Sequence, residues 1–168
     1  MSLTISLGKS ILLVDDDELL LETFRMFLEM DGYDVVVAST PYKALQMIEN
    51  TPIELAILDY NLPKMNGVQL GRLIHKIQEK ASIMFISGNP DIHELVKEAN
   101  YSVSAVMSKP IEVEHLTMTV RKIMGTNTSL ESIKTIEPNK IQNLVRFLTL
   151  SKTDINLNNS SLFGNLSI

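Results

Sequence analysis

Four short apolar runs in the sequence each end in a polar residue that can do chemistry. The residues that follow these runs are the pair Asp15-Asp16, then Asp59, Ser87 and Lys109. If the runs are neighbouring strands of a parallel sheet, their carboxyl ends meet along one crevice. Carboxylates for a divalent cation, a carboxylate nucleophile, a hydroxyl and a lysine are the groups that a protein needs to accept a phosphoryl group. These residues therefore predict a phosphoryl-transfer site.

The acidic run at the start of the chain predicts a cation site. Two adjacent carboxylates repel each other unless a cation or a base offsets their charge, so Asp15 and Asp16 favour cation binding. Magnesium suits such a site because it prefers oxygen ligands and usually keeps several waters. The backbone carbonyl of Asn61 is a candidate further ligand. Asp17 is instead expected to cap the helix that follows, since Asp is favoured there.

The other candidate site residues, Asp59, Ser87 and Lys109, differ in how strongly each one alone predicts a phosphoryl-transfer site. Asp59 precedes the turn-rich loop 60–67, which leaves its carboxylate open to attack phosphorus and form an acyl phosphate. A serine before Gly88 commonly serves turn chemistry, and most lysines are solvated surface charges, so Ser87 and Lys109 are weak signals singly. As a group they gain meaning. The lysine can pair with phosphoryl oxygens while the serine donates a hydrogen bond to another.

Elements that would position these residues are predicted from the alternation of short apolar runs with longer amphipathic segments. Continuous apolar strands indicate burial on both faces, and each connection is long enough for a helix, so we predict a parallel sheet covered on both sides. The predicted strands are residues 10–15, 33–38, 53–59, 82–87 and 103–108. The predicted helices are residues 18–30, 40–50, 67–79, 89–99 and 112–124.

The domain boundary is expected near residue 125. Residues 8–125 form the predicted domain, and residues 126–168 are interpreted as a linker with a possible short amphipathic helix at 139–150. Residues 151–168 are rich in Asn and Ser but still carry apolar side chains, so no second domain is assigned to them.

Bulk composition excludes several classes of function. The chain has 168 residues, a formal net charge of -5 and no cysteine, which removes disulfides and thiolate metal sites. The few basic residues after position 125 are scattered, which argues against direct nucleic acid binding. No apolar stretch approaches the roughly 20 residues that span a bilayer, so we expect no membrane segment and a cytoplasmic location.

The ordered motifs resemble the receiver domain of two-component response regulators, in a form similar to the chemotaxis receiver. The resemblance covers about residues 8–125. Its motifs are Val14-Asp15-Asp16-Asp17, Leu58-Asp59-Tyr60-Asn61-Leu62-Pro63-Lys64-Met65-Asn66-Gly67, Ile86-Ser87-Gly88 and Ser108-Lys109-Pro110. It implies an α/β fold: a flavodoxin-like, doubly wound, five-stranded parallel sheet of order 2-1-3-4-5 with helices on both faces.

The same resemblance implies a role for each site residue. Asp59 would be the phosphoacceptor, Ser87 the switch hydroxyl and Lys109 the phosphoryl-binding cation. A Mg2+ ion would be held by three carboxylates and one backbone carbonyl, those of Asp15, Asp16, Asp59 and Asn61. The Lys109-Pro110 peptide bond is expected to be cis by analogy.

The implied function is a phosphorelay receiver. A histidine kinase or a histidine phosphotransfer protein would donate the phosphoryl group to Asp59, and the modification would switch a partner-binding surface. Asn61 and Asn89 flank the attack path and, by resemblance, tune the rate of reset. The output partner is unknown, and the apolar stripe of 141–148 allows a homodimer, a docked helix or another partner.

Two alternatives stay open at this point. One is a degenerate receiver that serves as a phosphorylation-independent binding or dimerisation scaffold. The chain departs from the usual family pattern at Val106, where an aromatic residue is common, and at Ser102-Val103, where Gly-Ala is frequent. The other is a magnesium-dependent phosphohydrolase with an aspartyl phosphate, but Asn61 stands where such enzymes need a second acid. His75, His93 and His115 are interpreted as surface or packing residues.

Overall fold

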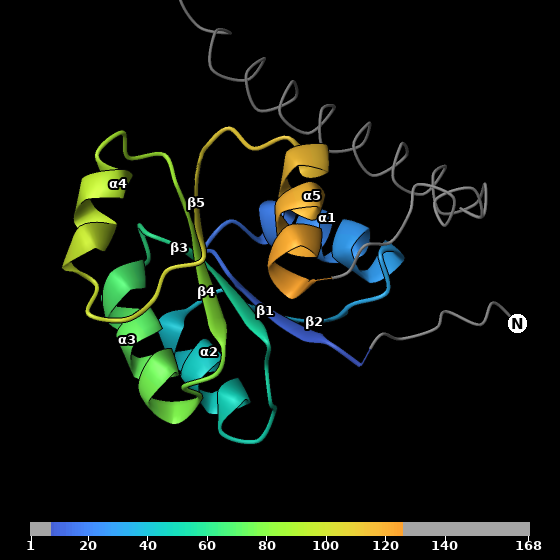
Figure 1. Cartoon of the computed structure of the whole chain (residues 1–168), viewed down its shortest axis with the longest axis horizontal. Helices are drawn as coiled ribbons and strands as arrows, with labels where there is room; N and C mark the ends of the chain where they lie inside the picture. Colours follow the sequence, from blue (N-terminus) through green and yellow to red (C-terminus); the bar gives the residue numbers. More distant parts are fainter. Residues whose placement is uncertain (1–7, 126–168) are drawn as a thin grey trace, which may run out of the picture. The chain divides into compact units, whose positions relative to one another are not determined.

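Five strands whose side chains are apolar on both faces form one parallel sheet in the computed structural model, which describes residues 8–125. The strand order is β2-β1-β3-β4-β5, which confirms the predicted doubly wound fold (Figure 1). The strands are β1 (Ser10–Val14), β2 (Asp34–Ala38), β3 (Leu55–Asp59), β4 (Ser82–Ser87) and β5 (Ala105–Ser108). The expected linker at 126–168 and helix at 139–150 lie outside the described residues.

Helices cover both faces of this sheet because crossovers between parallel strands are right-handed, and the strand order runs one way from β1 to β2 and the other way from β2 to β5. Helices α1 and α5 lie on one face, and α2, α3 and α4 lie on the other (Figure 1). The helical elements are α1 (Glu18–Met30), α2 (Pro41–Ile48), α3 (Gly67–Ile77), α4 (Ile92–Leu95), the 3-10 turn η1 (Val96–Glu98) and α5 (Val113–Met124).

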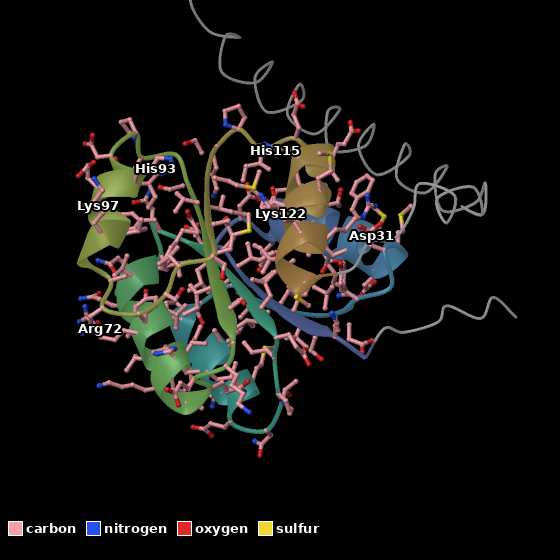
Figure 2. The ribbon with its side chains drawn as sticks, viewed as in Figure 1. Asp31, Arg72, His93, Lys97, His115 and Lys122 are labelled. Atoms are coloured by element: carbon pink, nitrogen blue, oxygen red, sulfur yellow. The ribbon has the colours of Figure 1, made fainter. Side chains whose placement is uncertain are left out.

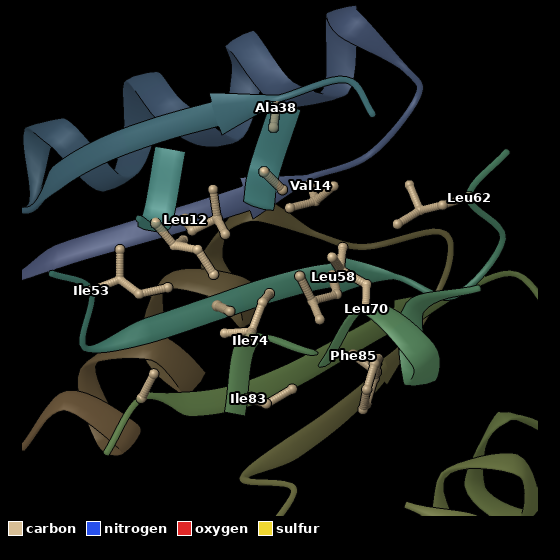
Figure 3. Packing of buried hydrophobic residues seen from close by; sticks show 14 of the residues in the cluster. Leu12, Val14, Ala38, Ile53, Leu58, Leu62, Leu70, Ile74, Ile83 and Phe85 are labelled. Carbon is tan, nitrogen blue, oxygen red and sulfur yellow. The ribbon is translucent and has the colours of Figure 1, made fainter. Parts of the chain in front are cut away.

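The alternation of side chains along β1 divides the core in two. Ile11 and Leu13 pack with the buried residues of α1 and α5, whereas Leu12 and Val14 pack with those of α2 and α3. Figure 3 shows the second cluster, in which Leu70 and Ile74 of α3 lie among the strand residues. These four residues of β1 are each at most 2% exposed. A strand buried on both faces reads as a continuous apolar run, which is why it was recognisable in the sequence.

Helices α1 and α3 each begin directly after a side chain that caps their first turn. Asp17 Oδ1 accepts hydrogen bonds from the backbone N–H groups of Leu19 and Leu20, at 3.0 and 3.1 Å, which confirms the predicted cap of α1. Asn66 and Gln69 form a reciprocal capping box at the start of α3. The cap fixes where α3 begins relative to the loop after Asp59.

The largest difference from the sequence prediction is the segment after β4. We expected a helix from Asn89-Pro90 to about Ala99, but α4 is a single turn followed by the 3-10 turn η1. No side-chain hydrogen bond caps α4, and Ile92 is its one buried residue. With so little apolar surface to bury, packing adds little to its stability. The other elements deviate from prediction by no more than about two residues at their ends.

Two polar side chains outside the predicted site, those of Gln78 and Arg121, hold neighbouring elements of the fold together through hydrogen bonds. The Gln78 side chain donates to the carbonyls of Ile48 and Thr51, at 2.7 and 2.8 Å, and accepts from the Ile53 N–H at 2.8 Å. On the other face, Arg121 of α5 makes two hydrogen bonds to Asp31 at the end of α1. Figure 2 labels Asp31 beside these two helices. One contact closes the turn after α2, and the other joins α1 to α5.

Replacing Gln78 by Ala is expected to lower the free energy of unfolding by about 1–3 kcal/mol, because two carbonyls and one N–H lose their partner. Urea unfolding followed by circular dichroism measures the change. Gln46→Ala is the matched control, since Gln46 is exposed and bonds only the Tyr42 hydroxyl among the described contacts. Equal stabilities of the two variants would contradict the prediction.

Candidate functional site

Strand register brings the predicted site residues to one edge of the sheet. Val14 is opposite Leu58, so Asp15 follows β1 beside Asp59, which ends β3. On the other side, Ser87 is opposite Ser108, and the backbone N–H of Lys109 donates to the Ser87 carbonyl at 2.7 Å. The carboxyl ends of four strands therefore meet where the sequence predicted a single crevice.

Three carboxylates converge in this crevice. Asp15, Asp16 and Asp59 each offer one carboxylate oxygen, and these oxygens lie within 4.8 Å of one another. Asp15 and Asp59 are buried, at 3% and 4% exposure, while Asp16 is exposed. Asp59 Oδ1 is buried and has no hydrogen-bond partner among the described residues. An unpartnered carboxylate oxygen beside two further carboxylates fits a hard divalent cation such as Mg2+.

Lys109 supplies the positive charge in this cluster. Its Nζ lies 2.7 Å from Asp15 Oδ2 and 3.5 Å from Asp59 Oδ2. Burial acts to lower the pKa of the Lys109 ammonium, but the hydrogen bond and charge of Asp15, with those of Asp59, outweigh burial and raise the pKa. The lysine is therefore a permanent cation at neutral pH. The peptide bond between Lys109 and Pro110 is cis, as the resemblance implied.

Asp59 is held in surroundings that oppose its charge. Burial is the largest influence that raises the pKa of the Asp59 carboxyl, and the neighbouring charge of Asp15 raises it further, against the opposing effect of Lys109. A cavity of about 10 Å³ lies beside the two carboxylates, with apolar side chains making up the rest of its wall: Leu13, Val14, Leu20, Leu21, Phe24, Ile57 and Ile86. The apolar wall accounts for the effect of burial.

Ser87 is fully buried at the end of β4, and its hydroxyl has a turn contact. The Asn89 backbone N–H donates to Ser87 Oγ at 3.0 Å. Asn89 in turn accepts from the Asp91 N–H at 2.9 Å. Ser87 therefore has the ordinary role in a turn that the sequence analysis gave as an alternative. In the strand register, Ser87 directly follows the partner of Asp59, which is Ile86, and is opposite Ser108, the residue before Lys109.

The loop after Asp59 returns tightly to the strand it left. The Gly67 N–H donates to the Tyr60 carbonyl at 2.9 Å, and the Tyr60 N–H donates to the Ile86 carbonyl. A Cβ on Gly67 would lie 2.4 Å from the Asp59 carbonyl oxygen, so only glycine allows this approach. The first turn of α3 is thus in direct backbone contact with Asp59. Asn61, in the loop, is exposed.

One residue that packs against α3 was missed by sequence reasoning. Tyr101, in the segment between η1 and β5, donates from its hydroxyl to the Val68 carbonyl at 2.8 Å and stacks on His75 with ring centroids 5.7 Å apart. A single aromatic residue in a loop carries no periodic signal. Gly71, an interior helix glycine, was the available clue, since it marks close approach of another group. His93 and His115 are exposed, as predicted, and are labelled in Figure 2.

Val106 does not reproduce the aromatic residue common in the family. It is half-buried on β5 and packs against the core cluster on the α2 and α3 side.

No helix in residues 8–125 is long and apolar enough to cross a membrane.

Curated proteins similar to this chain are bacterial regulators. The aerobic respiration control protein ArcA of Escherichia coli K12 is 25% identical over 154 residues, which cover 92% of this chain and 62% of ArcA. The transcriptional regulatory protein GlrR of the same strain is 29% identical over 106 residues, or 63% of this chain and 24% of GlrR. The chain therefore spans less than two thirds of the length of these relatives.

Solved receiver structures share the fold. A CheY-like response regulator receiver domain protein from Methanospirillum hungatei JF-1 has a TM-score of 0.65 and 30% identity, covering 75% of this chain and 97% of its own. A receiver domain protein from Clostridium thermocellum has a TM-score of 0.61 and 26% identity, covering 70% and 94%. Residues 11–121 match the family described as the response regulator receiver domain. The chain belongs to the response regulator receiver domain family.

Proposed function

We propose that residues 8–125 form a receiver that accepts a phosphoryl group on Asp59 from a phosphohistidine, carried by a histidine kinase or a histidine phosphotransfer protein. The observation that carries the proposal is the buried Asp59 carboxylate, whose Oδ1 has no partner among the described residues while Lys109 stands 3.5 Å from its Oδ2. Such a carboxylate has a free lone pair and a cation beside it to balance incoming charge.

The transfer forms one bond and breaks one. An Asp59 carboxylate oxygen attacks phosphorus, the O–P bond forms, and the P–N bond to the donor imidazole breaks with its electron pair returning to nitrogen, which takes up a proton. Hydrolysis resets the receiver, because water attacks phosphorus and releases inorganic phosphate from Asp59. Asn61 and Asn89, by position, are proposed to tune this reset.

A bound Mg2+ would offset negative charge on the phosphoryl oxygens during transfer. Asp15, Asp16, Asp59 and the Asn61 backbone carbonyl are the proposed ligands, and the three carboxylates have the required proximity. Lys109 bonds Asp15 in this structure. We propose that it turns to a phosphoryl oxygen once the acyl phosphate forms.

Ser87 is the proposed sensor of the modification. Its hydroxyl now accepts from the Asn89 N–H. Donation of the hydroxyl to a phosphoryl oxygen would realign it and disturb that turn contact, which would shift the segment that begins at Asn89. The shifted segment would present a changed surface to an output partner. GlrR, a relative named as a transcriptional regulatory protein, is longer than this chain, which covers 24% of it.

The two alternatives predict different behaviour. A scaffold that ignores phosphorylation needs no buried carboxylate oxygen without a hydrogen-bond partner, and Asp59 Oδ1 is such an oxygen among the described residues. A phosphohydrolase needs a second acid close to the nucleophile, and the residue two positions after Asp59 is Asn61, an exposed amide. A receiver that catalyses only its own phosphoryl uptake and hydrolysis fits the site better than either.

Beryllofluoride, a phosphoryl mimic, is expected to bind the chain only with Mg2+ and only through Asp59. Chemical shift changes in NMR titration should appear with wild type and disappear with Asp59→Asn. Lys109→Met should bind Mg2+ and weaken beryllofluoride by about 10- to 100-fold, because a charge-assisted hydrogen bond is lost. Intact mass after acetyl phosphate treatment should show one added phosphoryl group.

Lys122→Met is the matched control for the lysine variant, since Lys122 is exposed on α5 and lies outside the site (Figure 2). It should bind beryllofluoride like wild type. A folded wild-type protein that binds neither Mg2+ nor beryllofluoride would overturn the proposed function and favour the scaffold.

Asp59→Asn should also stabilise the metal-free protein at pH 7, by about 0.5–2 kcal/mol. The pKa of Asp59 is raised in the folded state, so between the unfolded pKa near 4 and the folded pKa the folded state binds more protons. Wild-type stability therefore falls as pH rises through that interval, and the variant lacks this loss.

Urea unfolding in a chelator, repeated from pH 4 to pH 8, tests this expectation. The stability gain of Asp59→Asn over wild type should be small at the acid end and reach its full value above the folded pKa. Glu79→Gln, which changes an exposed carboxyl outside the site, should show no such pH-dependent gain. A variant that is less stable than wild type at pH 7 would show that the Asp59 charge is well compensated.

A further inference from the structure

We propose that Tyr101 is a latch that holds the segment between α4 and β5 against α3 in the unphosphorylated protein and is released when Asp59 is modified. The inference rests on the proposed receiver function and goes beyond it. It assigns the coupling role to a residue outside β5, in a chain whose β5 carries Val106 rather than an aromatic side chain.

The latch is built by three contacts on α3. The Tyr101 hydroxyl donates to the Val68 carbonyl at 2.8 Å. Its ring stacks on His75, with an interplanar angle of 28°. The hydroxyl end lies over Gly71, where an added Cβ would be 2.4 Å from Tyr101 Oη. Burial raises the pKa of the Tyr101 phenol to about 12, which fits a hydroxyl enclosed by the helix.

Gly71 is explained by this contact. An interior glycine weakens a helix relative to alanine, so its presence needs a compensating reason. The missing Cβ creates the slot that the tyrosine occupies. Gly71 and Tyr101 therefore work as a pair, one on α3 and one on the segment that follows η1.

Each partner of the latch is connected along the chain to a residue of the site: Val68 follows Asp59 through the loop 60–67, and Tyr101 follows Ser87 through the segment that contains α4. Gly67, directly before Val68, approaches the Asp59 carbonyl so closely that no Cβ fits. At the other end, the segment that carries Tyr101 begins at Asn89, whose N–H bonds Ser87 Oγ. A change at Asp59 would thus reach the Val68 carbonyl through the start of α3. It would reach the Tyr101 hydroxyl through Ser87 and the segment that follows it.

The segment between these two attachments contains little regular helix, although Val96, Ala99 and Val103 pack against the core cluster. It contains the single turn α4, in which only Ile92 is buried, and the 3-10 turn η1. A groove of about 230 Å³ lies between the start of α3 and α4, lined by Tyr60, Asn66, Val68, Gln69, Arg72 and Leu95. This space lets α4 shift without first expelling a packed side chain. Movement of α4 would pull Tyr101 away from α3, because only a short stretch of chain joins α4 to Tyr101.

Removing the latch should favour the modified state. Tyr101→Phe deletes the hydroxyl that bonds Val68 and keeps the ring, so it should bind beryllofluoride about 2- to 10-fold more tightly than wild type in the presence of Mg2+. Tyr42→Phe is the matched control, since Tyr42 is an exposed tyrosine on α2 that bonds Gln46. It should bind with wild-type affinity.

Hydrogen–deuterium exchange of residues 99–104 supplies an independent readout. Exchange there should quicken when beryllofluoride binds wild type, and should already be fast in unliganded Tyr101→Ala. Gly71→Ala should act like Tyr101→Ala, because the new methyl displaces the ring. Combining the two substitutions should add little to either alone, since both remove the same contact.

The outcomes separate the two proposals. A wild type that shows no response to beryllofluoride would overturn the receiver function and this inference with it. A wild type that responds, with Tyr101→Phe affinity equal to that of Tyr42→Phe and unchanged exchange at 99–104, would overturn the latch alone. Tighter binding by the Phe variant with faster exchange on beryllofluoride binding would support it.

Discussion

The ion pair between Lys109 and Asp15 is the interaction on which the functional edge depends. Placing Asp15, Asp16 and Asp59 together concentrates negative charge beside an apolar wall, and such a cluster repels itself unless a cation is close. Lys109 reaches across from the end of β5 to supply that charge. The contact also ties an edge strand to the centre of the sheet. The neutralisation of Asp59 is only partial, because its Oδ1 has no hydrogen-bond partner among the described residues, and this suits a nucleophile better than a structural carboxylate.

The rest of the described domain keeps this edge in place. A sheet buried on both faces allows little adjustment of its strands, because any slip would move apolar side chains out of register with the helices. Gln78 closes the turn after α2, and Arg121 joins α1 to α5. These fixed points lie away from the segment between β4 and β5. That segment, which follows Ser87, has only the single turn α4 and the 3-10 turn η1 as regular structure.

Local patterns in the sequence predicted a parallel sheet and the set of site residues, whereas the strand order was implied by the resemblance to receiver domains. Continuous apolar strands and the polar residues that end them, such as Asp59 and Lys109, can be read without any tertiary information. The length of α4 could not, since helix propensity there is overridden by the lack of a surface to bury. The Tyr101 contact was equally hidden, because it depends on a gap at Gly71 that exists only once α3 and the following loop are placed together. The roles of the site residues remain proposals.

The brevity of α4 sets the energy scale on which a switch in this chain would operate. Moving a two-state equilibrium from 1:99 to 99:1 requires about 5.5 kcal/mol of preference for one state. Two charge-assisted hydrogen bonds to a phosphoryl group, at about 1.5–3 kcal/mol each, approach that value only when little opposes them. A long, well-packed helix would absorb most of this energy in lost burial. A single turn in which Ile92 is the one buried residue loses less burial when it moves, so more of that energy is available to change populations.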